Sequence, residues 1–176
     1  MTLKRCYLIL FLLLATAITD QVFAESGNEE AVKTAFLYNF FKFIDWPKAA
    51  STEKVLNLCT TNDDHLGDSL WVLKNKTIGN TPIFIRRGIN DDTLKTCHMV
   101  FISGSNNDEV IIKNLKGLPI VTVSDMPGFI DHGGMIGLVR ADNRLSFEIN
   151  IDTVNASSVH IGTQMLKLAK RINTEK

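Results

Sequence analysis

The sequence lacks the local motifs from which catalytic and phosphate-binding sites are usually read. It has no GxxxxGK(S/T) phosphate loop, no GxGxxG after a predicted strand, no HExxH and no GxSxG nucleophile elbow. Its histidines, His65, His98, His132 and His160, are not paired at metal-ligand spacing. We therefore predict no catalytic residue, no metal site and no cofactor, although a triad assembled only in space leaves no such motif.

The chain also has no excess of charge and few cysteines. Its 19 basic residues balance 19 acidic ones, so no nucleic-acid partner is predicted. Cys6 precedes the apolar N-terminal run, which leaves Cys59 and Cys97 in the body of the protein. An even count in an oxidising compartment predicts one disulfide between them; two free buried thiols are the alternative.

The N-terminus predicts export. Lys4 and Arg5 precede the apolar run YLILFLLLATAI (7–18), and Val22-Phe23-Ala24 suits a signal-peptidase cleavage site. The run is shorter than the roughly 20 apolar residues of a spanning helix. We predict a signal peptide over 1–24 and one exported domain over 25–176, with an uncleaved membrane anchor as the alternative.

Predicted helices and strands alternate through the exported part. Apolar periodicity and turn residues predict helices over 29–44, 66–75, 107–117 and 157–172, a helical turn over 91–95, strands over 55–60, 82–87, 98–104 and 119–124, and a hairpin over 135–151. This order predicts an α/β fold: a three-layer domain with a mixed, mostly parallel sheet of five to six strands and a C-terminal β-hairpin plus helix.

Aromatic residues gather in the first predicted helix. The segment AFLYNFFKFIDWP (35–47) holds six of them, although the chain is 8% aromatic. On a helical wheel its apolar positions cover about half the circumference, more than the ~100° needed to dock on one sheet face. Either loops of the same subunit cover the excess, with Trp46 as a lid, or a partner protein contacts Leu37, Tyr38, Phe41 and Trp46.

A few polar residues are weaker candidates. Arg140 and Arg144 lie near strand ends and could bind a phosphate or carboxylate ligand. Asp63-Asp64-His65 follows a strand end, where α/β sheets often bind ligands. Ser105, in a turn after a strand, and His132, in a glycine-rich segment, invite a catalytic interpretation. Solvated turns and helix caps are the simpler explanation for each.

Four blocks of the sequence, in order, resemble the YfiR-like family of periplasmic proteins. They are KTAFLYNFFKFIDWP (33–47), CHMVFIS (97–103), PIVTVSDMPGFIDHGGMIGLVRADNRLSFEIN (119–150) and QMLKLAKRI (164–172). The resemblance implies a non-enzymatic, homodimeric periplasmic repressor. Such a protein binds the periplasmic domain of an inner-membrane diguanylate cyclase, lowers cyclic-di-GMP signalling and thereby regulates biofilm formation. It also implies sequestration by a peptidoglycan-associated outer-membrane lipoprotein.

The resemblance extends to the cysteines in part. Cys59 and Cys97 match one disulfide of the family in position and spacing, whereas the second disulfide of its best-known member has no cysteines here. A geometric question accompanies the pair. Cys59 ends one predicted strand and Cys97 begins another, so adjacent parallel strands would hold them at opposite edges of the sheet.

Two other functions stay open from the sequence. The first is a periplasmic sensor of an aromatic or nucleotide-like small molecule, bound near Trp46 or the arginines. The second is a hydrolase that uses Ser105 or His132. A ligand-dependent thermal shift would favour the sensor.

Overall fold

The computed structural model describes residues 21–47, 54–62, 64–89, 91–104, 108–142 and 144–174, with only the backbone described for 21–28 and 91–92. The predicted signal peptide therefore lies outside the described residues except for 21–24, whose backbone is helical. Asp63 and Ser105, named above as candidates, also lie outside them. Within the described part of the chain, no helix combines the length and the apolar character needed to cross a membrane.

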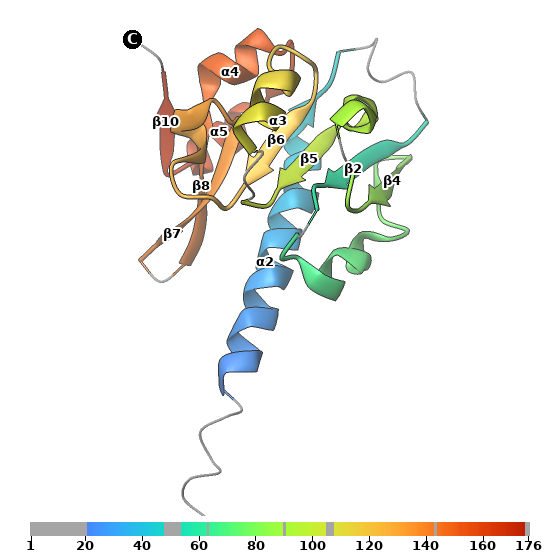
Figure 1. Ribbon diagram of the computed structural model, residues 1–176, viewed down its shortest axis with the longest axis vertical. Helices are drawn as coiled ribbons and strands as arrows, with labels where there is room; N and C mark the ends of the chain where they lie inside the picture. The colour runs from blue at the N-terminus through green and yellow to red at the C-terminus, as the bar shows by residue number, and fades with distance from the viewer. Residues whose placement is uncertain are drawn as a thin grey trace, which may run out of the picture.

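An eight-stranded mixed sheet runs through the molecule in the order β10-β8-β7-β6-β5-β2-β4-β3 (Figure 1). Its strands are β2 (Leu56–Thr60), β3 (Thr77–Ile78), β4 (Thr81–Arg86), β5 (Met99–Ile102), β6 (Val121–Ser124), β7 (Ile136–Ala141), β8 (Arg144–Asn150) and β10 (Arg171–Asn173). All neighbouring pairs are parallel except β7–β8 and β3–β4. The mixed, mostly parallel α/β sheet is confirmed, but it has eight strands rather than five to six.

Helical elements cover both faces of this sheet. On one face lie α2 (Gln21–Phe43), the 3₁₀ turn η2 (Gly67–Leu73) and α5 (Thr163–Leu168). On the other lie α3 (Asp108–Leu115) and the 3₁₀ turns η3 (Asp91–Thr96) and η4 (Phe129–His132). We call these the α2 face and the α3 face. Each has its own apolar core, so the three-layer arrangement holds.

Local sequence explains most of these elements. All four residues of β5 and of β6 are buried, as expected for apolar runs in the middle of a parallel sheet. Helix α3 stops before Gly117, whose φ of 80° suits glycine after a helix end. The expected hairpin is β7–β8, with Asp142 at a φ of 50° in its turn.

The predicted last helix over 157–172 is wrong. The chain instead forms α4 (Ile151–Ala156), β9 (His160–Ile161), α5 and β10. The side chain of Asn150 caps α4 by accepting a hydrogen bond from the Thr153 N–H (3.0 Å). Ser158, at a φ of 62°, interrupts the helical backbone. Strand β9 pairs with β1 (Ile44–Asp45) and β10 with β8, and such distant pairings leave no local periodicity to read.

The disulfide forms without the expected conflict. Cys97 lies after η3, on the α3 face of the sheet, rather than in β5. The N–H of the next residue, His98, donates to the carbonyl of Asn57 in β2 (2.9 Å), which holds this segment beside β2. The Cα atoms of Cys59 and Cys97 are therefore 6.0 Å apart, within disulfide range.

Candidate functional site

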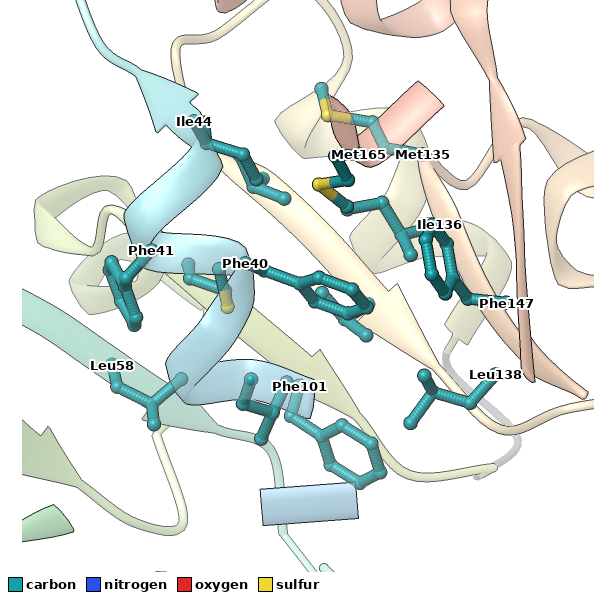
Figure 2. Packing of buried hydrophobic residues seen from close by; sticks show 14 of the residues in the cluster. Phe40, Phe41, Ile44, Leu58, Phe101, Met135, Ile136, Leu138, Phe147 and Met165 are labelled. Atoms are coloured by element: carbon teal, nitrogen blue, oxygen red, sulfur yellow. The ribbon is translucent and has the colours of Figure 1, made fainter. Parts of the chain in front are cut away.

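The aromatic helix docks on its own sheet. The stripe that contains Leu37, Phe40 and Phe41 is buried, and Phe40 points toward Phe147 of β8 with ring centroids 5.2 Å apart (Figure 2). Leu37 and Phe41 are 0% and 2% exposed. The excess apolar width is covered by η2, whose buried Leu70 belongs to the same core. Leu37 and Phe41 therefore present no surface to a partner, and this part of the expectation is corrected.

Tyr38 and Trp46 are half-buried at the rim of this core. The Tyr38 hydroxyl donates to the Thr77 carbonyl (3.3 Å), which fastens the helix to β3. Trp46 stacks on Phe41 at 5.5 Å and donates its indole N–H to the His98 carbonyl (3.1 Å). The arrangement matches the alternative in which the subunit covers its own helix, with Trp46 as the lid.

Charged residues meet where the middle of α2 passes the carboxyl end of β6. The helix runs opposite to β5 and β6, because its far end lies near His98 before β5 while Lys33 contacts Asp125 after β6. Lys33 is only 8% exposed, and its Nζ lies 2.6 Å from Asp125 and 2.9 Å from Glu29. Arg140 pairs with Glu29 from the β7–β8 hairpin. The network joins α2, the loop after β6 and the hairpin.

The two candidate arginines do not converge on one ligand. Arg140 lies opposite Leu145 in the hairpin, and Arg144 lies opposite Ala141. Side chains alternate between faces along a strand, so the two guanidinium groups leave opposite faces of the hairpin. Arg140 is already paired with a carboxylate of its own chain. The structure thus places the two arginines that the sequence suggested as ligand-binding residues on opposite faces of the hairpin.

The order of the strands reverses between β2 and β5, which is the position at which open α/β sheets bind ligands. The order β4-β2-β5-β6-β7 is that of flavodoxin-like sheets, which bind ligands at the carboxyl ends where the order reverses. Here the Ser103 N–H donates to the Thr61 hydroxyl (3.0 Å), tying together the segments after β5 and β2. The hydroxyls of Ser103 and Thr34 are buried and, within the described part of the chain, accept or donate no hydrogen bond. Such groups usually hold a water or another polar molecule.

The other polar candidates have structural tasks. Asp64 accepts hydrogen bonds from Thr60 Oγ1 (2.7 Å), the Leu66 N–H (3.2 Å) and the Arg87 guanidinium (2.7 and 2.9 Å). It therefore fixes the loop after β2, but it does not cap η2, whose N-cap residue Leu66 makes no side-chain cap hydrogen bond. The described side chains form no group of three or more potential metal ligands.

Asp131 and His132 contact different partners. The Arg171 guanidinium binds Asp131 through two hydrogen bonds of 2.8 Å and Glu148 through one of 2.7 Å. The hydrogen bonds from Arg171 lower the pKa of Asp131, and the two carboxylates raise the pKa of Arg171. His132 lies with Nδ1 2.8 Å from the Gly128 carbonyl. This cluster ties η4 to the edge strand β10.

Exposed apolar side chains on η2 and β4 were missed from the sequence. Trp71 and Val72 project from η2, and Phe84 projects from β4. The strand over 82–87 was predicted, but nothing local shows that it lies next to the edge of the sheet. The alternation in PIFIRR (82–87) showed only which residues lie on the same face of the strand.

One comparison with known proteins adds to this geometry. A protein-family model described as YfiR/HmsC-like matches residues 30–170. The match begins in α2 and ends between α5 and β10, so it includes both core faces and the disulfide.

Proposed function

The chain belongs to the YfiR/HmsC-like family, and from this premise we propose that it is a periplasmic regulatory protein rather than an enzyme. Its target is the periplasmic domain of an inner-membrane diguanylate cyclase, which it represses. The observation that carries the proposal is the family match over residues 30–170. The predicted signal peptide over 1–24 supplies the route to the periplasm.

The mechanism is a shift in the receptor's conformational equilibrium. A protein that binds the inactive form of the cyclase's outer domain more tightly than the active form lowers the active fraction by that difference in affinity. A tenfold difference corresponds to about 1.4 kcal/mol. A peptidoglycan-associated outer-membrane lipoprotein that competes for the repressor releases the cyclase by mass action. Homodimerisation is part of the proposal, because it would let one repressor engage two receptor domains.

Two features of the fold support a binding role. Asp64, from the segment considered for ligand binding, and Asp131, beside the catalytic candidate His132, are held by Arg87 and Arg171 in structural contacts. The exposed surface retains Trp71 beside Arg87, and these residue types dominate the energetic centres of protein interfaces.

The test is a gene deletion with cyclic-di-GMP measured by mass spectrometry. Loss of the protein should raise cyclic-di-GMP, and the full chain should restore the low level. A version lacking residues 1–24 should fail to restore it although it is expressed, because it stays in the cytoplasm. Co-purification with a membrane-bound diguanylate cyclase should accompany repression. An unchanged cyclic-di-GMP level after deletion, without capture of any membrane receptor, would overturn the proposal.

A small-molecule sensor is the second candidate, and the buried hydroxyls of Thr34 and Ser103 favour it. A polar ligand at the carboxyl ends of β2 and β5 would satisfy the Ser103 hydroxyl. Nucleotides, amino acids and sugars are screened by thermal shift, and a true ligand should raise Tm in proportion to the logarithm of its concentration. Ser103→Ala should abolish that shift. A shift that persists in Ser103→Ala places the ligand elsewhere.

A further inference from the structure

Strand β4 leaves the C-terminal part of its outer edge unpaired. β3 pairs with it only at Thr81 and Pro82, whereas β2 pairs along its inner edge from Ile83 onward. The Ile83 N–H donates to the Lys76 carbonyl (2.9 Å), so it points outward. Because backbone groups alternate in direction along a strand, the N–H and C=O of Ile85 also point outward. No described strand lies beside them.

Apolar side chains flank both sides of this open edge. On the α2 face, Trp71 and Val72 of η2 are 46% and 67% exposed, and Arg87, directly after β4, lies 5.9 Å from the Trp71 ring centroid. On the α3 face, Phe84 is 55% exposed. We call the outer edge of residues 84–87, with Trp71, Val72 and Phe84, the β4 edge surface. A strand placed along it would lay alternate side chains against Phe84 and against the η2 pair.

Basic residues stand at both ends of the β4 edge surface. Lys76 directly precedes β3, with Lys74 two residues before it, and Arg86 ends β4. Arg86 donates to the Thr96 hydroxyl (2.8 Å), and none of the three cations has an acidic partner among the described residues. Lysines alone often protect an edge against pairing. Here they frame exposed aromatic surface, which favours pairing with an acidic strand.

We propose that the β4 edge surface docks an extended segment of a partner protein, which adds to the sheet as a further strand. The segment carries apolar side chains toward Phe84 and Trp71 and at least one carboxylate toward the cations. Backbone hydrogen bonds to Ile85 give the register. The inference rests on the proposed function for the partner's identity: the strand belongs to the receptor domain. The chemistry of the edge can be tested without that partner.

The probe is an end-capped synthetic hexapeptide with a glutamate at each end and four valines between them, titrated into the ¹⁵N-labelled exported protein. The expected result is a saturable shift of the Ile85 and Phe84 amide resonances. The same peptide with every backbone nitrogen methylated has no N–H to donate from either edge and should cause no such shift. Absence of the shift, or an equal effect of the methylated peptide, would overturn main-chain docking.

Two variants with matched controls locate the site. Phe84→Glu should weaken peptide binding about tenfold or more. Val110→Glu makes the same kind of change on α3 at the same exposed fraction of 55% and should leave binding unchanged. Ile85→Pro removes the outward N–H, while the hydrogen bonds to β2 come from Phe84 and Arg86, so the fold should persist and binding should be lost. If Phe84→Glu and Val110→Glu weaken peptide binding equally, the assignment of the binding site to the β4 edge surface is wrong. This comparison remains decisive even if Ile85→Pro does not fold.

The cyclic-di-GMP assay separates this inference from the proposed function. If Phe84→Glu loses both peptide binding and repression, both hold. If it loses peptide binding but still represses, the function stands and the edge is not its docking site. If deletion leaves cyclic-di-GMP unchanged while the peptide binds as described, the edge stands and the receptor is another protein. A dimer that Phe84→Glu dissociates, without peptide binding, would assign the edge to a second copy and overturn the proposal.

Discussion

Removing the disulfide should destabilise the protein chiefly through the unfolded chain. Cys59 and Cys97 are 38 residues apart in sequence, and the loop between them contains η2, β3, β4 and η3. In the native state the crosslink only joins β2 to the end of η3, two segments that the sheet and its core already hold together. The unfolded chain has no such restraint, so the crosslink restricts it strongly.

The loop length sets the magnitude. Closing a loop of this size removes about 13 cal/mol/K of chain entropy, which corresponds to about 4 kcal/mol at 25 °C. For a chain of this size, 1 kcal/mol shifts Tm by about 2–4 °C, so Tm should fall by about 8–16 °C on reduction. The urea m-value should rise slightly, because the unfolded chain exposes more surface without the crosslink.

The assay is urea unfolding of the oxidised protein, of the same protein under a phosphine reductant, and of the Cys59→Ala/Cys97→Ala double variant. Reduction keeps both buried sulfur atoms, so it isolates the crosslink from the loss of packing. The double variant should be insensitive to reductant. A thiol assay on the unfolded, oxidised protein should find neither cysteine free. If that holds and reduction still leaves the midpoint unchanged, the loop-entropy reasoning is refuted.

Three further perturbations follow from the contacts. Leu37→Ala should lower the free energy of unfolding by about 2–5 kcal/mol because the side chain is fully buried, and Tyr38→Ala should have a smaller effect; urea unfolding measures both. Lys33→Met should destabilise by about 3 kcal/mol because the partly buried Asp125 loses its cation and Glu29 keeps only Arg140, as thermal and urea unfolding would show. Asp131→Asn should lower the free energy of unfolding at neutral pH but not in acid. Arg171 lowers the Asp131 pKa from 3.8, so this surface pair stabilises above that pH and the contribution, at most about 1 kcal/mol, fades as pH falls through the folded-state pKa. Unfolding measured from pH 7 to pH 2 checks it.

One exposed residue provides a control for these stability measurements, and each prediction has an outcome that would contradict it. Arg144→Ala, without a described contact, should change stability by less than about 0.5 kcal/mol. Equal costs of Leu37→Ala and Tyr38→Ala would contradict the burial of one face of α2. A neutral Lys33→Met would mean that the carboxylates are solvated rather than paired. A difference between wild type and Asp131→Asn that grows in acid would contradict the assigned pKa direction.

Most elements could be predicted because their causes are local. The alternation of VLNLCT, the apolar run of HMVFISG and the turn residues around 141–143 act within a few residues, and they became β2, β5 and the β7–β8 hairpin. The C-terminal region could not be predicted in this way. Its residues suit a helix by period, but pairing of β10 with β8 and of β9 with β1 overrode that preference.

The same distinction between local and distant causes applies to the candidate sites. The sequence by itself determined the aromatic content of α2, the cysteine pair and the blocks of the YfiR/HmsC-like family, because these depend on residue identity and spacing. Only the tertiary structure decided that η2 covers Leu37 and Phe41, that the hairpin separates Arg140 from Arg144, and that β4 has an open edge. Exposure is a property of what packs beside a residue, and distant segments of the chain supply those neighbours.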